Sequence, residues 1–183
     1  MNTALLLIDI QNDYFDGGKM ELVGPERAAD KAKIILDRFR HDGLPIIHIQ
    51  HIATSPAATF FLPDTTGVDI NEKVLPLPTE KKIIKHFPNS FRETELLEYL
   101  KENKIETLVI CGMMTHMCID ATTRAAKDYG FNCLLIGDAC ATRDLEINNE
   151  TVKAKDVQNS FLAALNSFYA TVLTTECYLK EKV

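Results

Sequence analysis

Apolar and polar positions follow two patterns along the chain. Short runs of mostly apolar residues, rich in Leu, Ile and Val, are separated by stretches in which apolar residues return every three or four positions. The short runs predict buried strands, and the longer stretches predict amphipathic helices. The predicted strands are 4–9, 45–52, 81–85, 106–111, 131–139 and 170–174, and the predicted helices are 25–43, 93–103, 115–129 and 149–168.

The order of these elements predicts the fold class. Near-continuous apolar strands between helices are typical of a parallel sheet that is covered on both faces. Right-handed crossovers then limit the topology to a few doubly wound orders. We therefore expect an α/β protein with one domain, residues 1–183, built as a three-layer α/β/α sandwich. Its six-stranded parallel sheet has the expected order 3-2-1-4-5-6, with the strands numbered along the chain.

The segment 53–80 does not fit this alternation. It contains four prolines and shows no regular period. A loop of that length in a compact domain is often functional, or it contains an element that has been misread. The rings of Phe60 and Phe61 lie in this loop, where they either close over a ligand or cover the core.

Composition and charge exclude several classes of partner. The chain has 183 residues, 25% of them charged, and a net charge of −6. Because no block of Lys or Arg stands out, we expect no nucleic-acid partner. Apolar runs are too short to cross a membrane, and the N-terminal segment lacks the basic start of a signal peptide, so we expect no membrane partner and a cytoplasmic location. Five cysteines without a C-x-x-C pair favour neither a disulfide framework nor a zinc site.

Three chemically reactive residues follow three predicted strands. In an open α/β sheet, ligands bind at the carboxyl ends of the strands, near the point where the strand order reverses. Asp9 ends the first strand, Lys85 ends the third, and Cys118 lies in the first helical turn after the fourth. The thiolate is the reactive form of cysteine, and both a helix N-terminus and a nearby ammonium favour it.

We interpret Cys118 as a nucleophile, Asp9 as a general base and then acid, and Lys85 as their electrostatic partner. The backbone N–H groups of Met114 and Cys118 are candidate donors to an oxyanion. Taken singly, each side chain has an ordinary structural explanation: a buried helical thiol, a turn cap and a solvated strand end. Seven residues could line a substrate pocket, although core packing or bracing by hydrogen bonds explains several of them equally well. They are Gln11, Tyr14, Phe15, Phe60, Phe61, Phe91 and His116.

Three motifs resemble one known family. LLLIDIQNDYFDGG near the N-terminus, IIKHFPNSF around Lys85, and CGMMTHMCIDATTRAA around Cys118 resemble the isochorismatase-like cysteine hydrolases. Nicotinamidases, N-carbamoylsarcosine amidase and streptothricin hydrolase belong to that group. The resemblance extends to about residue 174. It implies a six-stranded parallel sheet, a triad at Asp9, Lys85 and Cys118, a cis peptide between Met113 and Met114, and a homo-oligomer, either a dimer or larger.

The sequence also departs from the family pattern. Nicotinamidases carry an Asp-x-His element after the second strand, which helps to hold a metal, whereas this chain reads HIQHIATSP there. His48 and His51 are three residues apart on a strand, so they point to opposite faces and make a poor metal pair. We therefore expect no catalytic metal and no cofactor, and nicotinamide is in doubt as the substrate.

The expected function is that of a cysteine hydrolase. It would cleave a C–N bond of a small amide, lactam or carbamoyl compound through a covalent thioester-type intermediate. Alternatives are an isochorismatase-type vinyl ether hydrolase, for which some relatives lack the cysteine, and a non-hydrolytic ligand-binding or redox thiol protein. A serine hydrolase using Ser90 and His86 lacks the G-x-S-x-G elbow, and no G-x-G-x-x-G motif supports dinucleotide binding.

Overall fold

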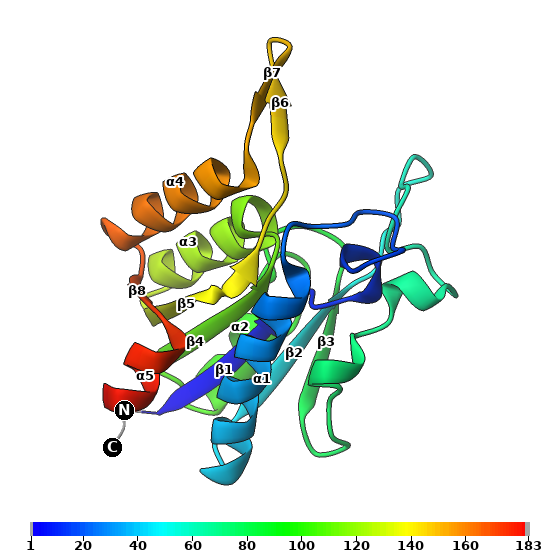
Figure 1. Ribbon diagram of the computed structural model, residues 1–183. Coiled ribbons are helices and arrows are strands. Elements are labelled where there is room, and N and C mark those ends of the chain that lie inside the picture. The colour runs from blue at the N-terminus through cyan, green and yellow to red at the C-terminus, as the bar shows by residue number, and fades with distance from the viewer. Residues whose placement is uncertain (1, 182–183) are drawn as a thin grey trace.

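The central sheet of the protein has six parallel strands in the order β3-β2-β1-β4-β5-β8 (Figure 1). This computed structural model describes residues 2–181. The predicted fold class and strand order are confirmed, and the sixth strand of the sheet is β8 because a separate hairpin adds two strands before it. The sheet strands are β1 (Thr3–Ile8), β2 (Ile46–His51), β3 (Lys81–Lys85), β4 (Thr107–Met113), β5 (Asn132–Ala141) and β8 (Thr171–Leu173).

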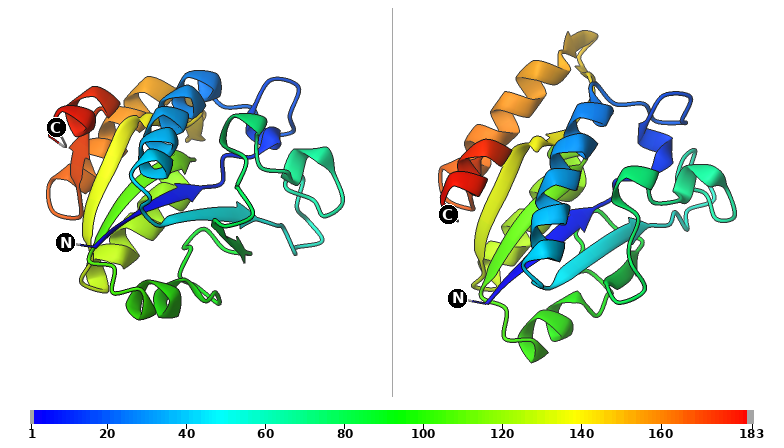
Figure 2. Two further views of the ribbon diagram at one scale, coloured as in Figure 1. Left: turned by 90° about the horizontal axis from the view of Figure 1, so that it is seen from below. Right: turned by 60° about the horizontal axis from the view of Figure 1, so that its bottom comes forward.

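Helices cover both faces of this sheet (Figure 2). On one face, α1 (Pro25–His41) and α5 (Thr175–Glu181) pack over one apolar cluster. On the other face, α2 (Leu96–Glu102), α3 (Asp120–Asp128) and the end of α4 (Ala154–Asn166) pack over a second cluster. The structure therefore has the three predicted layers.

Strand β1 shows why the apolar runs are continuous rather than alternating. Leu5 and Leu7 belong to the cluster beneath α1, whereas Leu6 and Ile8 belong to the cluster beneath α2 and α3. All four side chains are at most 2% exposed. A strand that is buried on both faces needs an apolar residue at every position.

The predicted helix 149–168 is wrong at its start. Strands β6 (Leu145–Ile147) and β7 (Glu150–Val152) form an antiparallel hairpin that projects from the body (Figure 1), and α4 begins only at Ala154. Asn148 and Asn149 turn the chain between the two strands with φ values of 52° and 61°. Two consecutive residues with positive φ form the tight turn that hairpins favour, and asparagine tolerates that conformation. Two adjacent asparagines are typical of a turn, but the helical spacing of the apolar residues outweighed this signal in the prediction.

The predicted helix 115–129 also differs in its first turn. Thr115–Ile119 form a π-helical turn, and regular α-helix starts with α3 at Asp120. Single π-turns inside helices are frequent at functional sites. In residues 53–80, short 3-10 turns at Thr66–Val68 and Glu72–Val74 interrupt an otherwise irregular loop.

Among residues 2–181, none of the helices is long and apolar enough to cross a membrane. The five cysteines are all free.

A buried ionic network fixes the end of the long loop to the sheet. Glu80 accepts hydrogen bonds from Arg40 Nε at 2.7 Å and Nη2 at 2.9 Å, and from the Leu77 N–H at 2.9 Å. His48 Nε2 lies 2.8 Å from Glu80 Oε2. Burial opposes the charge of Glu80, yet these three partners lower its pKa from 4.5 to about 2.

We expect Glu80→Gln to lower the free energy of unfolding by about 2–3 kcal/mol at neutral pH. Because the pKa of Glu80 is lower in the folded state, its carboxylate stabilises the protein fully above about pH 4.5 and loses that effect as the pH falls toward about 2. Urea unfolding at several pH values measures the difference. The control is Glu95→Gln, at an exposed pair with Lys81. A loss for Glu80→Gln that stays constant down to about pH 3 would contradict this linkage.

Candidate active site

Asp9, Lys85 and Cys118 meet at the carboxyl ends of the central strands. Lys85 Nζ lies 2.8 Å from Asp9 Oδ2, and both side chains are fully buried. Cys118 is 3% exposed, and its sulfur lies within 4.8 Å of a carboxylate oxygen of Asp9. The structure therefore brings together three residues that are far apart in the sequence.

Asp9 is held at the point where β1 ends. Its N–H donates to the Ile49 carbonyl at 3.1 Å, and its φ is 51°, a value that non-glycine residues rarely adopt. Backbone outliers of this kind cluster at functional sites. On the neighbouring strand β4, a Cβ on Gly112 would lie 2.0 Å from the Ile8 carbonyl oxygen. Glycine is thus required for the close approach of β4 to the end of β1.

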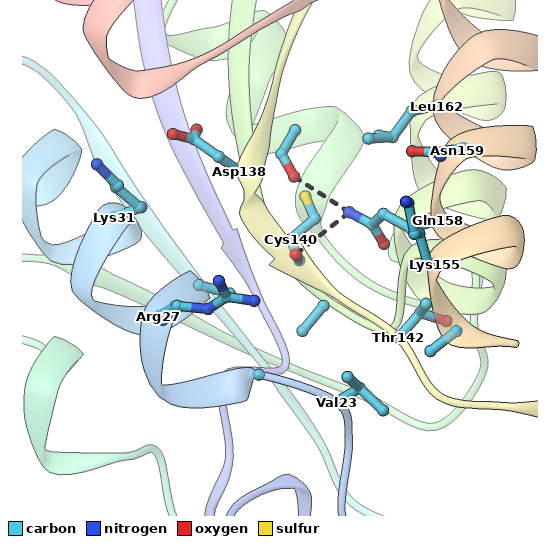
Figure 3. A pocket seen from close by; sticks show the side chains of 15 residues that line it. Val23, Arg27, Lys31, Asp138, Cys140, Thr142, Lys155, Gln158, Asn159 and Leu162 are labelled. Atoms are coloured by element: carbon cyan, nitrogen blue, oxygen red, sulfur yellow. Dashed lines mark hydrogen bonds between the residues drawn. The ribbon is translucent and has the colours of Figure 1, made fainter.

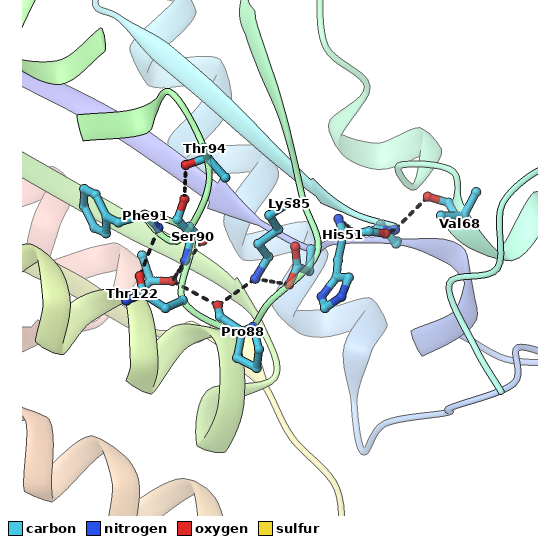
Figure 4. Close-up of polar contacts among 11 residues, drawn as sticks. His51, Val68, Lys85, Pro88, Ser90, Phe91, Thr94 and Thr122 are labelled. Atoms are coloured by element: carbon cyan, nitrogen blue, oxygen red, sulfur yellow. Dashed lines mark hydrogen bonds and ion pairs between the residues drawn. The ribbon is translucent and has the colours of Figure 1, made fainter. Parts of the chain in front are cut away.

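Lys85 is positioned by the segment that follows β3. Its ammonium donates to the Pro88 carbonyl at 2.8 Å, as well as contacting Asp9 (Figure 4). Thr122 of α3 donates to Ser90 Oγ at 2.9 Å and accepts the Ser90 N–H at 3.0 Å. These bonds attach residues 88–90 to α3, so the helix that follows Cys118 also helps to place the lysine.

Cys118 lies in the π-helical turn Thr115–Ile119. This turn begins directly after a cis peptide between Met113 and Met114. That bond is at the position that the family resemblance implies. The Thr115 hydroxyl lies 2.6 Å from Gln158 Oε1 of α4 and 3.2 Å from the Ala141 carbonyl of β5. These contacts attach the turn to two elements outside it.

Electrostatics at the sulfur differ from the sequence interpretation. Burial raises the pKa of the Cys118 thiol well above its usual range, and the nearby Asp9 carboxylate raises it further. Lys85 lowers the pKa of Cys118 but does not compensate. Burial also lowers the pKa of Lys85, but Asp9 and Cys118 raise it by more.

The raised pKa favours a neutral thiol beside the carboxylate–ammonium pair. This direction is opposite to the stabilised thiolate that the sequence predicts at a helix N-terminus. A second anion next to the Asp9 carboxylate is unfavourable in a buried site. Both oxygens of that carboxylate are buried: Oδ2 faces the Lys85 ammonium at 2.8 Å, whereas Oδ1 has no hydrogen-bond partner within the described chain. Oδ1 is thus available to accept the thiol proton.

Aromatic side chains cover one side of the triad. The Tyr14 ring lies 4.7 Å from Phe61 and 6.0 Å from Phe60, and the His51 ring lies 5.7 Å from Phe61. Burial raises the pKa of Tyr14 well above its usual range, and the proximity of Cys118 adds to this. Three of the predicted pocket residues, Tyr14, Phe60 and Phe61, thus pack together beside the triad.

The Gln11 side chain fixes the backbone next to these aromatic residues and is not directed at a substrate. Its side chain is fully buried, donates to the His51 and Val68 carbonyls at 2.9 and 2.7 Å, and accepts the His51 N–H at 2.7 Å. With both donors used, the amide has little capacity left for a substrate. The structure therefore supports bracing rather than substrate binding at Gln11.

Asp13 attaches the aromatic loop in the same way. Its carboxylate accepts the Phe61 N–H at 2.6 Å and the Lys19 N–H at 3.2 Å. A Cβ on Gly67 would lie 2.1 Å from an Asp13 oxygen, so glycine lets the loop close onto the carboxylate. The residues that follow Asp9 thus hold residues 53–80 against the sheet.

Two other predicted pocket residues have packing roles. Phe91 lies 5.1 Å from the Tyr129 ring and 6.3 Å from the Phe131 ring, away from the triad and near the start of β5. Phe15 is 5% exposed and belongs to the cluster beneath α1. Core packing, the alternative to a pocket role, therefore accounts for both Phe91 and Phe15.

His116 lies beside the nucleophile but contacts its own neighbours. Its Nδ1 lies 2.6 Å from Thr142 Oγ1, and its ring packs edge-on against Phe161 at 6.1 Å. Burial lowers the pKa of His116, and Arg143 lowers it further, which places a guanidinium close to this ring. Arg143 Nε is buried and has no hydrogen-bond partner in the described part of the chain. Sequence reasoning missed Arg143, which lies just beyond β5.

Sequence reasoning also missed the place of His51. One of its ring nitrogens, a carboxylate oxygen of Asp9 and the Cys118 sulfur all lie within 4.8 Å of one another. These side-chain types can bind a metal ion. However, the Lys85 ammonium already supplies a positive charge 2.8 Å from Asp9, so we do not assign them as metal ligands. His48 contacts Glu80 instead and is not part of the group.

The serine alternative has no geometric support. The Ser90 side chain is fully buried and accepts from Thr122, while His86 Nδ1 lies 2.7 Å from the Ile52 carbonyl. No hydrogen bond joins Ser90 to His86, both of which lie within the described residues.

A separate cavity lies between α1 and α4, beside the end of β5 (Figure 3). Its volume is about 580 Å³, and Arg27, Lys31 and Lys155 bring cationic groups to it. None of the triad residues lines it. Gln158 connects it to the active site, because its amide donates to the Gly137 and Cys140 carbonyls and accepts from Thr115.

Comparison with known proteins identifies the family. Residues 3–177 match the sequence profile of the Isochorismatase domain. The isochorismatase family protein YddQ of Bacillus subtilis is 53% identical over 180 residues, which cover 98% of this chain and 100% of YddQ. The chain belongs to the isochorismatase family.

Solved structures and other relatives agree with this assignment. A crystal structure of an isochorismatase hydrolase from Oleispira antarctica has a TM-score of 0.92 and 48% identity, with 96% of this chain and 94% of that chain covered. Streptothricin hydrolase of Streptomyces noursei is 30% identical over 166 residues, or 90% of this chain and 56% of that protein. The protein is an isochorismatase-family hydrolase, as the motifs predicted.

For this isochorismatase-family hydrolase, we expect no thiolate at Cys118 near neutral pH. The pKa of Cys118 is raised by burial and by Asp9, so we expect its sulfur to be protonated at neutral pH. Ultraviolet absorbance reports thiolate, and the difference between wild type and Cys118→Ser isolates this one residue. Cys177→Ser, at an exposed cysteine, is the control. Thiolate absorbance that is assigned to Cys118 and persists below about pH 7 would contradict the neutral resting state.

Proposed function

We propose that this protein cleaves a C–N bond of a small amide, lactam or carbamoyl compound through a thioester on Cys118. The observation that carries the proposal is the contact of a thiol with a buried carboxylate–ammonium pair. A thiol nucleophile next to a base is typical of covalent acyl transfer. The motifs also resemble those of nicotinamidases and N-carbamoylsarcosine amidase, which cleave C–N bonds.

Acylation starts from the neutral thiol. Asp9 takes the proton of Cys118 as the sulfur attacks the carbonyl carbon of the substrate. Negative charge then develops on the carbonyl oxygen, and we assign its stabilisation to the backbone N–H groups of Met114 and Cys118, with Lys85 nearby. When the tetrahedral intermediate collapses, Asp9 gives its proton to the departing nitrogen and the C–N bond breaks. Water then hydrolyses the thioester and restores the thiol.

The surroundings favour a small, flat substrate. Tyr14, whose pKa is raised in part by the nearby Cys118 and Asp9, packs with Phe60 and Phe61. The buried Nε of Arg143 would be satisfied by a substrate group that accepts hydrogen bonds. Because Cys118 is only 3% exposed, access to its sulfur is restricted, which favours a small substrate.

The two alternative functions have less support. Cleavage of a vinyl ether does not require a thiol nucleophile, so it leaves Cys118 without a role. Redox-sensing cysteines are typically exposed and have a low pKa. Cys118 is buried, and its pKa is raised.

Assembly and location are further proposals. We expect a homo-oligomer because the family resemblance implies one. Five free cysteines suit the reducing cytoplasm.

The direct test is a panel of small amides, lactams and carbamoyl compounds, with mass spectrometry of the intact protein. We expect a product from at least one compound, together with an acyl adduct on Cys118. Cys118→Ala should lose product and adduct but keep its thermal unfolding, whereas Cys177→Ala should keep both. Full turnover of a confirmed substrate by Cys118→Ala would refute the covalent route.

A further inference from the structure

His51 is the imidazole at the triad that the acylation steps leave unused. It ends β2, and in the parallel ladder it pairs with Lys85, which ends β3. Register partners on neighbouring parallel strands project from the same face of the sheet. The same strand ends thus bring an ammonium and an imidazole to one place.

The backbone of His51 is unusually well fixed. Gln11 donates to its carbonyl at 2.9 Å and accepts its N–H at 2.7 Å, so one buried amide holds both backbone groups. On the next residue, the Ile52 N–H donates to the Lys85 carbonyl at 3.0 Å. The ring itself packs against Phe61. A catalytic group needs this kind of support, because small displacements cost rate.

The separations at His51 are compatible with a bridging water. A ring nitrogen of His51, a carboxylate oxygen of Asp9 and the Cys118 sulfur lie within 4.8 Å of one another. Two hydrogen-bond-length contacts of about 2.8 Å that meet at a tetrahedral angle span about 4.6 Å, which falls within that upper limit. A water held by His51 would therefore reach an acyl carbon carried on the sulfur.

We propose that His51 is the general base of the second half-reaction, in which water hydrolyses the thioester; this rests on the proposed function. A ring nitrogen takes a proton from water as the water oxygen bonds to the acyl carbon. The C–S bond then breaks, and the imidazolium returns the proton to the sulfur. The acid leaves with the other hydrogen of the water, and the thiol is restored.

The charges around His51 suit this role. Burial lowers the pKa of His51 despite the carboxylate of Asp9, and Lys85 lowers it further, so the ring is unprotonated near neutral pH. A free imidazole is about two pKa units more basic than a carboxylate in model peptides. The two bases therefore have different roles. Asp9 transfers the proton between the thiol and the departing nitrogen, and His51 takes the proton from the water.

The test separates the two half-reactions with p-nitrophenyl acetate, a small activated ester. Protein is acetylated, freed of excess ester by gel filtration, and followed by intact mass as the acetyl group is lost. We expect wild type and His51→Gln to acquire one acetyl group on Cys118. His51→Gln should then lose it about 100-fold more slowly, within the usual range for a general base. The matched control is His86→Gln, at an exposed neighbouring histidine, which should lose it at the wild-type rate.

Chemical rescue guards against a general structural effect. In His51→Gly, added imidazole should speed loss of the acetyl group, and it should not do so in His86→Gly. If His51→Gln deacetylates as fast as wild type, or if imidazole restores nothing in His51→Gly, the role of His51 is refuted while the Cys118 route stands. If wild type never acquires an acetyl group on Cys118, both the route and the role are overturned.

Discussion

The ion pair between Asp9 and Lys85 is the contact on which the rest of the site depends. Both side chains are fully buried, so water stabilises neither charge. Removing two charges from water is costly, and the cost is recovered only with close geometry and further hydrogen bonds. The 2.8 Å contact and the bond from Lys85 to the Pro88 carbonyl supply these. The pair also sets the state of the third member, because a carboxylate that is already charged keeps the neighbouring thiol protonated.

The sheet makes this contact possible. Strands β3, β2, β1 and β4 are neighbours, so their carboxyl ends deliver Lys85, His51, Asp9 and the turn with Cys118 to one rim. Segments beyond the strands then hold each group in place. The residues after Asp9 fasten the long loop, and α3 fastens the segment after Lys85. Side chains that take no part in the reaction thus position the reactive residues at the ends of the strands.

Much of this could be predicted from the sequence. The apolar runs were long enough to locate every strand of the sheet, and reactive residues at strand ends indicated where the site lies. Other features depend on contacts that no local pattern reveals. Phe91 looked like a pocket residue but packs on Tyr129, and Gln11 spends its amide on the backbone of another strand. The protonation of Cys118 depends on how fully it is buried beside Asp9, which local sequence does not report.

The measurement that tests the central claim most directly is a double-mutant cycle of the ion pair, read as the free energy of unfolding. Asp9→Asn and Lys85→Met each leave one charge buried without its partner, and we expect each to cost about 3–5 kcal/mol. The double variant removes both charges and should cost far less than the sum of the single losses. Single losses that simply add would show that the two charges do not stabilise one another, and would contradict the account.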